Sequence, residues 1–280
     1  DYFRRNRVDS ERFRKNSVGK LMSGEILHAR DGSIATVTLS NPDKLNALDL
    51  AMWKRLGEIM RELHTDATLR CVVLRGAGEK AFAAGADISE FQTTRRNAKV
   101  ARKYGESIEA TMHAVRACSH PTLAMIHGVC VGGGLEIASQ CDMRICGAGS
   151  RFGVPTKKLG LVVGHGEMQG LLSVIGRAAM LEILLEGRIF GADEALQKGL
   201  VNRVVPDAEV EAESLAAARH IAEGAPLVAR WHKKFALRLE NPRALTKAER
   251  DEAYACFDTG DFKTGVKAFL AKQRPGFKGK

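Results

Sequence analysis

The chain has 280 residues, of which 45% are hydrophobic and 27% are charged, and its formal net charge is +10. These proportions are ordinary for globular proteins, and they exclude a chain that is disordered throughout. No run of residues approaches the ~20 apolar positions of a membrane helix, so we expect a soluble protein without a membrane partner.

The positive charge is concentrated at one end. Residues 1–20 contain seven Lys or Arg against three Asp or Glu. They lack the apolar stretch of a secretory signal, and their acids argue against a transit peptide. We expect a basic extension that is disordered or that precedes the natural start, for which Met22 is suited. Basic residues are not interleaved with aromatic ones, so we expect no specific nucleic-acid partner.

Six cysteines are present, none in a C-x-x-C pair, and several lie in apolar runs. This favours buried free thiols in a reducing, cytoplasmic compartment over a disulfide framework. The spacings of HExxH and EF-hand motifs are also missing from the sequence, so we expect no metal site.

The first part of the chain alternates strand and helix patterns. Residues 34–39 (IATVTL) are β-branched and predict a strand that ends before Pro42. Apolar residues from Leu48 to Leu63 then recur on one helical face, with Asp49 available as the N-cap. Residues 71–74 predict the next strand.

A second long helix follows, with an apolar stripe from Val100 to Val115. Residues 123–126 and 143–146 predict two more strands, separated by three glycines and a short helix that we expect to start at Leu135. Strands and helices in alternation predict an α/β core. After Pro206 the pattern is helical throughout, so we divide the chain into a core of residues 21–206 and a helical region of residues 207–280.

Two glycine-containing segments carry the signs of a reactive site. They are residues 81–88 (AFAAGADI) and residues 127–136 (HGVCVGGGLE). Glycines between a strand and a helix let the backbone approach a ligand and leave free N–H groups at the helix start. Glu136 would lie on the first helical turn, beside an anion held by those groups. Close packing and a favourable dipole interaction would explain the same residues without any chemistry.

The order of motifs resembles the crotonase, or enoyl-CoA hydratase/isomerase, family. The resemblance runs from about residue 25 to the C-terminus through residues 41–48 (NPDKLNAL), 81–88, 120–145, 187–205 and 257–278. It implies an α/β fold made of a spiral of ββα turns, with a C-terminal helical region used in trimerisation. It also implies a homotrimer or a hexamer of two stacked trimers.

The resemblance further assigns roles to individual residues. Ala86 and Gly133 would donate the two N–H groups that hold a thioester oxygen, and Glu136 would be the acid/base. His127 matches a structural strand position. No separate cofactor is implied, because coenzyme A enters as part of the acyl-CoA substrate. The residues expected to contact coenzyme A are Lys44, Ala47, Ala84, Asp87, Ile88, Phe269 and Lys272.

The chain departs from the family at one catalytic position. The second glutamate of a hydratase should fall where this chain has Thr156. Glu167 and His165 follow in an unusual glycine-rich stretch and are candidate replacements, although Glu167 could simply cap a helix. Thr156 itself could hold a water molecule through its hydroxyl group.

Three hypotheses therefore stay open. The first is a hydratase-like lyase of fatty acid metabolism that adds water to a 2-enoyl-CoA or removes it. The second is an isomerase, a decarboxylase or a C–C lyase that uses the same enolate. The third is an acyl-CoA-binding protein that has lost catalysis together with the second glutamate.

Overall fold

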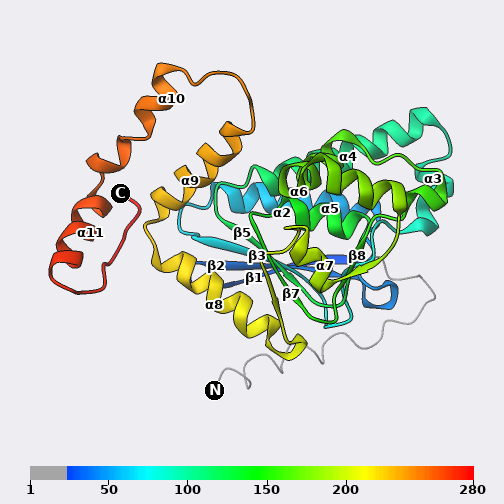
Figure 1. Cartoon of the computed structure of the whole chain (residues 1–280), viewed down its shortest axis with the longest axis horizontal. Helices are drawn as coiled ribbons and strands as arrows, with labels where there is room; N and C mark the ends of the chain where they lie inside the picture. Colours follow the sequence, from blue (N-terminus) through cyan, green and yellow to red (C-terminus); the bar gives the residue numbers. More distant parts are fainter. Residues whose placement is uncertain (1–23) are drawn as a thin grey trace.

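The computed structural model describes residues 24–280. The prediction for the basic extension of residues 1–20 lies outside the described residues. Among the described residues, the chain forms two sheets surrounded by helices, with the C-terminal helices extending to one side (Figure 1).

The larger sheet has six strands in the order β1-β2-β3-β5-β7-β10. Strands β1 and β2 pair antiparallel, and the other neighbours pair parallel. Strands β3 and β5 are almost wholly buried, as expected for parallel strands covered on both faces. The strand bounds are β1 (Glu25–Asp31), β2 (Ile34–Ser40), β3 (Cys71–Gly76), β5 (Thr122–Ile126), β7 (Met143–Gly147) and β10 (Arg203–Val205).

A smaller sheet runs alongside in the order β4-β6-β8-β9. From β3 to β8 each pass of the chain adds one strand to the large sheet and the next strand to the small one, so the predicted spiral of ββα turns is confirmed. The bounds are β4 (Ala81–Ala83), β6 (Val129–Val131), β8 (Arg151–Gly153) and β9 (Phe190–Gly191).

Four helices pack on one face of the large sheet (Figure 1). The prediction that Asp49 caps the first of them is confirmed, since its carboxylate accepts a 2.8 Å hydrogen bond from the Met52 N–H. The glycine-run helix begins at Gly133, two residues earlier than predicted. The bounds are α2 (Leu50–Thr65), α4 (Ala98–Arg116), α5 (Gly133–Gln140) and α6 (His165–Glu186), and two short helices are α3 (Phe91–Thr94) and α7 (Ala192–Gln197).

Helix α8 (Val210–Glu223) covers the opposite face of the large sheet, where Val210, Ala217 and Ala218 pack on strand residues. The change to helical structure therefore falls near residue 206, but α8 shares its hydrophobic core with the sheet. The remaining helices, α9 (Pro226–Leu239), α10 (Lys247–Glu252) and α11 (Gly260–Leu270), lie at the left in Figure 1.

By length and apolar composition alone, α6 is the one helix of the described chain that could cross a membrane. Its residues Leu171, Met180 and Ile183 are nevertheless buried in the protein core. The helix is also interrupted, because Gly176 has a non-helical backbone with φ 71° and ψ 172°. Helix α6 is therefore part of the folded domain.

Candidate active site

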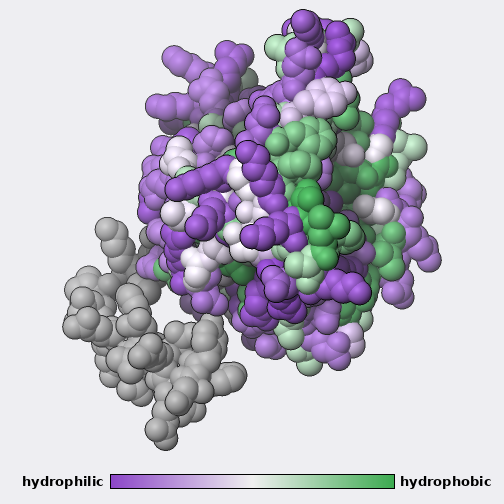
Figure 2. All heavy atoms as spheres, turned by 90° about the vertical axis from the view of Figure 1, so that its left-hand side faces the viewer, coloured by the Kyte–Doolittle hydropathy of each residue, from purple (hydrophilic) through white to green (hydrophobic). Residues whose placement is uncertain are grey.

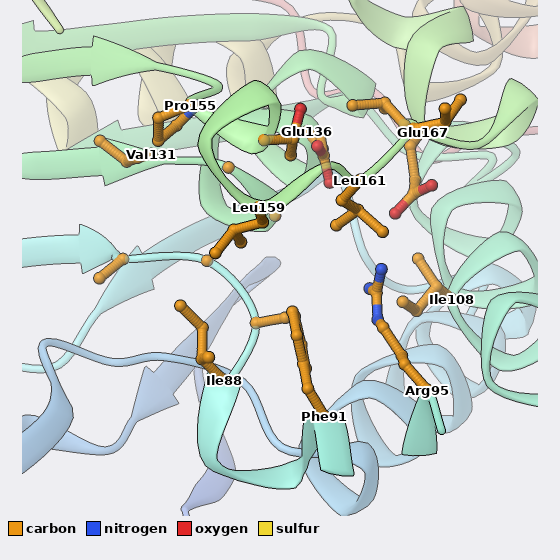
Figure 3. A pocket seen from close by; sticks show the side chains of 18 of the residues that line it. Ile88, Phe91, Arg95, Ile108, Val131, Glu136, Pro155, Leu159, Leu161 and Glu167 are labelled. Carbon is orange, nitrogen blue, oxygen red and sulfur yellow. The ribbon is translucent and has the colours of Figure 1, made fainter. Parts of the chain in front are cut away.

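A cavity of about 630 Å³, counted out to its open mouth, lies between the small sheet, α5, α3 and the start of α6 (Figure 3). Apolar side chains form most of its surface, and three charged side chains reach it. The residues that line it are Trp53, Ala84, Gly85, Ala86, Ile88, Phe91, Arg95, Ile108, Val131, Gly132, Gly133, Glu136, Pro155, Thr156, Leu159, Leu161, Val162, Val163 and Glu167.

Two backbone N–H groups lie side by side at the cavity wall. A Cβ atom placed on Gly133 would be 3.5 Å from the Ala86 nitrogen, so the two segments are in contact. Leu48 bonds the residues on either side of Ala86, accepting from the Asp87 N–H and donating to the Gly85 carbonyl. Within residues 24–280, neither the Ala86 N–H nor the Gly133 N–H has a backbone acceptor. Both are therefore free to bind an anion or a carbonyl oxygen.

Glycines make this close approach possible. Gly85 and Gly132 have φ values of 103° and 52°, which side-chain-bearing residues rarely adopt. A Cβ on Gly134 would come within 2.2 Å of the Ala83 carbonyl oxygen, so α5 lies directly on the backbone of β4. The positions of the two donors are therefore fixed by main-chain packing.

Glu136 lies on the first turn of α5 and is 4% exposed. Its carboxyl group accepts no hydrogen bond from the described residues and reaches the cavity (Figure 3). Burial and the nearby Glu167 raise the pKa of Glu136 to about 8, against a weaker opposing effect of Arg95. Glu136 thus holds a proton near neutral pH and can release it.

Glu167 enters the same cavity from the first turn of α6. It also caps the helix, since one carboxylate oxygen accepts a 2.6 Å hydrogen bond from the Gly164 N–H. Burial raises the pKa of Glu167, while the Gly164 N–H and Arg95 act in the opposite direction. Glu167 therefore caps helix α6 and also lines the cavity, so its position agrees with both interpretations of the sequence.

Thr156 lies in the cavity, whereas His165 lies outside it. Thr156 lines the cavity at the start of a 3-10 helix (Thr156–Leu159). His165, the first residue of α6, is exposed and lines a neighbouring hollow that also includes Glu109. His165 does not line the cavity of Glu136, but it shares the neighbouring hollow with Glu167, and its role in the reaction stays a prediction. His127 is buried outside the cavity.

The expected coenzyme A contacts fall into two groups. Ala84 and Ile88 line the cavity. Ala47 is buried and does not line it. Lys44 forms an ion pair of 2.5 Å with Asp87. Burial tends to raise the pKa of Asp87, but hydrogen bonds from Lys44 and Ser89 outweigh it and hold that pKa below its usual value.

Phe269 and Lys272 are not part of this cavity. Phe269 is 82% exposed on α11, and Lys272 follows the end of that helix. Helix α11 lies at the opposite side of the molecule from α3, which borders the cavity (Figure 1).

The sequence patterns did not identify Trp53, Phe91 or Arg95 as cavity residues. Trp53 lies on the predicted apolar face of α2, a pattern that buried core residues share. Phe91 begins α3 and Arg95 is its C-cap, and the four residues of this helix are too few to show a periodicity.

Comparisons with known proteins agree with this architecture. A family model for enoyl-CoA hydratase/isomerase matches residues 29–280. The short-chain-enoyl-CoA hydratase of Clostridium acetobutylicum is 34% identical over 256 residues, covering 90% of this chain and 97% of that protein. The crotonyl-CoA hydratase of Syntrophomonas wolfei is 31% identical over 255 residues, with the same two coverages of 90% and 97%.

Among solved structures, an enoyl-CoA hydratase/carnithine racemase from Magnetospirillum magneticum superposes with a TM-score of 0.90 at 49% identity. The match covers 91% of this chain and 96% of that chain. The fold, the family model and the relatives agree over nearly the whole described length. The chain therefore belongs to the enoyl-CoA hydratase/isomerase family.

Proposed function

We propose that this protein is an acyl-CoA enzyme of the hydratase type, which adds water to the double bond of a 2-enoyl-CoA or removes it. The observation that carries the proposal is the juxtaposition of three groups in one cavity. The unpaired N–H groups of Ala86 and Gly133 lie side by side, and the carboxyl group of Glu136 reaches the same space. A thioester enolate needs those groups together.

In the proposed reaction the thioester oxygen accepts hydrogen bonds from Ala86 and Gly133. When the oxygen of water bonds to C3, the C2–C3 electron pair moves toward the thioester, whose oxygen gains negative charge. One carboxylate takes a proton from the attacking water, and one carboxylic acid delivers a proton to C2. The product gains H and OH, and the enzyme exchanges one proton between its two acids.

The two acids of the cavity suit this division. Glu136, with a pKa near 8, holds the proton that C2 receives. Burial raises the pKa of Glu167 as well, but the Gly164 N–H and Arg95 oppose this rise, so we assign to Glu167 the proton taken from water. We therefore assign to Glu167 the work of the carboxylate that is missing at Thr156. Thr156 is left to orient the water through its hydroxyl group.

The coenzyme A portion would pass Ala84 and Ile88 at the mouth of the cavity. The ion pair between Lys44 and Asp87 lies next to Ile88 in the sequence and leaves the Lys44 side chain 36% exposed. A phosphate could approach that cation from solvent. We propose no resident metal and no cofactor other than the thioester itself.

The first experiment is mass spectrometry of the products formed from crotonyl-CoA. We expect a gain of one water, and we expect Glu136→Gln to reduce kcat by about 10²–10⁴-fold, the usual contribution of a general acid or base. Binding of butyryl-CoA, which cannot react, should stay close to wild type. Glu58→Gln, on the exposed outer face of α2, is the matched control.

Other outcomes separate the rival functions. A shifted double bond on a 3-enoyl-CoA, or loss of CO₂ from a malonyl-type thioester, without hydration would replace the hydratase by an isomerase or a decarboxylase. Tight binding of thioesters without any turnover would indicate a binding protein. Near-wild-type turnover of Glu136→Gln would remove Glu136 from the mechanism.

We further propose that the chain forms a homotrimer or a hexamer through its C-terminal helices. Figure 2 shows an apolar surface on the side of the molecule where α10 and α11 lie. Its exposed apolar residues include Tyr254 (67%), Phe257 (53%), Phe269 (82%) and Leu270 (78%). An apolar surface of this kind is typical of a protein–protein interface. Association would also bring Phe269 and Lys272 toward the cavity of a neighbouring copy.

Light scattering on the eluted protein tests this proposal against the 30.5 kDa mass of one chain. We expect the mass of three or six chains, and a monomer for the double variant Phe269→Asp with Leu270→Asp. Both side chains are largely exposed in the single chain, so the variant should retain its fold. A wild-type monomer would contradict the proposal.

A further inference from the structure

Arg95 is a cation in the wall of the cavity that forms no ion pair with a carboxylate of the described residues 24–280. It ends α3, and its guanidinium carbon lies 4.5 Å from the centroid of the Phe91 ring and 4.8 Å from that of Tyr104. Figure 3 shows the side chain pointing into the cavity between Phe91 and Ile108, toward Glu167. The two aromatic rings hold the guanidinium group in this direction.

Arg95 has no carboxylate partner among the described residues. Its Nε atom is buried without a hydrogen-bond partner within residues 24–280, and so are the Trp53 indole N–H and the Tyr104 hydroxyl. Burial raises the pKa of Tyr104, whereas Arg95 and Trp53 act in the opposite direction, so the only polar protein group close to the guanidinium among these three is a neutral phenol. Buried donors without acceptors are uncommon in native proteins and point to a missing ligand or water.

The two carboxyl groups that face Arg95 do not supply the acceptor. Glu136 holds a proton near neutral pH, since its pKa is raised to about 8. Glu167 already accepts the Gly164 N–H at 2.6 Å. Both feel the charge of Arg95 at a distance, but neither forms an ion pair with it. The guanidinium fork is therefore available to a ligand.

We propose that Arg95 binds a carboxylate at the far end of the acyl chain, so that the preferred substrates are CoA thioesters of short dicarboxylic acids. This proposal rests on the proposed function, because it takes the cavity as the acyl site. The planar guanidinium group matches a carboxylate with two parallel hydrogen bonds. A purely alkyl chain would leave the cation desolvated and unpaired beside Ile108 and Leu161.

The location favours the acyl chain over the phosphates of coenzyme A as the source of the anion. Arg95 is set among Phe91, Ile108 and Leu161, whose apolar side chains suit an acyl group. A phosphate placed among them would lose most of its hydration. Lys44, in contrast, is partly exposed beside Ile88 at the cavity mouth.

The test compares two saturated thioesters of the same shape by calorimetry. Glutaryl-CoA ends in a carboxylate, and 5-methylhexanoyl-CoA ends in an isopropyl group of similar size. We expect the wild-type protein to bind glutaryl-CoA about 10- to 100-fold more tightly, as a charged hydrogen-bonded pair provides. Arg95→Met should abolish this preference and leave the affinity for free coenzyme A unchanged.

Arg96→Met is the matched control, because it removes the same charge from the exposed neighbouring position. It should keep the preference, and Arg95→Lys should keep part of it. The wild-type comparison needs no variant, so a variant that fails to fold does not prevent the test.

Three results would overturn the proposal. The first is equal or weaker binding of glutaryl-CoA by the wild type. The second is an equal loss of affinity for free coenzyme A in Arg95→Met, which would assign Arg95 to the phosphates. The third is an unchanged preference in that variant with a shifted pH profile of turnover, which would make Arg95 a positioning residue for Glu167. If neither thioester binds, the proposed function fails as well.

Discussion

The wall formed by β4, β6 and α5 faces the wall formed by α3, α4 and the start of α6, and the two are held in different ways. Every residue of α5 is buried, and its glycines touch the backbone of the small sheet. The facing wall and the adjoining loops carry partly exposed apolar side chains, including Ile88 at 58% and Val162 at 86%. The anion-binding N–H groups and Glu136 lie on the rigid wall, whereas Glu167 and the residues assigned to substrate choice lie on the adaptable one.

A methyl group added to each wall tests this difference most directly. Gly134→Ala should reduce the free energy of unfolding by about 3 kcal/mol or more, because its Cβ would overlap the Ala83 carbonyl oxygen. Gly105→Ala, on α4 where a Cβ meets nothing within 4 Å, should instead increase it by about 0.5–1 kcal/mol. Urea titrations of both variants measure the two effects. A well-tolerated Gly134→Ala would contradict the tight packing of α5.

The buried acid of the rigid wall should also lower stability at alkaline pH. The pKa of Glu136 rises from 4.5 to about 8 on folding, so the folded state binds this proton more tightly. The wild type should therefore lose stability progressively as the pH rises from 4.5 to about 8. Glu136→Gln has no such proton to lose. Thermal melts of both proteins across this range should diverge, and parallel curves would refute the buried protonated acid.

The smallest of these effects should come from the acid on the adaptable wall. Glu167→Gln should reduce kcat for hydration by about 10- to 100-fold, less than Glu136→Gln, because water can still attack slowly without its base. The cap on α6 should survive, since the amide oxygen still accepts the Gly164 N–H. Initial rates with crotonyl-CoA measure the change, and Glu106→Gln, an exposed residue on the neighbouring hollow, serves as control. An unchanged kcat would leave Glu167 as a helix cap only.

The sequence predicted the rigid wall better than the adaptable one. The β-branched strands, the Asp49 cap and the glycine run each have a local pattern, and the structure places them as expected. The departure at Thr156 drew attention to Glu167, which lines the cavity, and to His165, which lines only the neighbouring hollow. Sequence proximity could not separate the two, because it does not reveal which side of a helical turn a residue faces.

Arg95 could not be predicted in the same way. An arginine after a short polar segment is usually solvated, and its sequence neighbours do not distinguish it from Arg96. Its role depends on the rings of Phe91 and Tyr104 and on the two acids across the cavity. These contacts exist only after the four helices α3, α4, α5 and α6 have packed together.

The free donors of Ala86 and Gly133 belong to the main chain, and this has a consequence for how such a site can diversify. A substitution removes a side chain but leaves a backbone N–H in place unless it introduces proline. Residues such as Phe91, Arg95 or Leu161 could therefore be exchanged one at a time while the pair of donors persists. Each protein along such a series of substitutions would keep its anion-binding N–H groups. Specificity for a new acyl group could therefore evolve without an inactive ancestor.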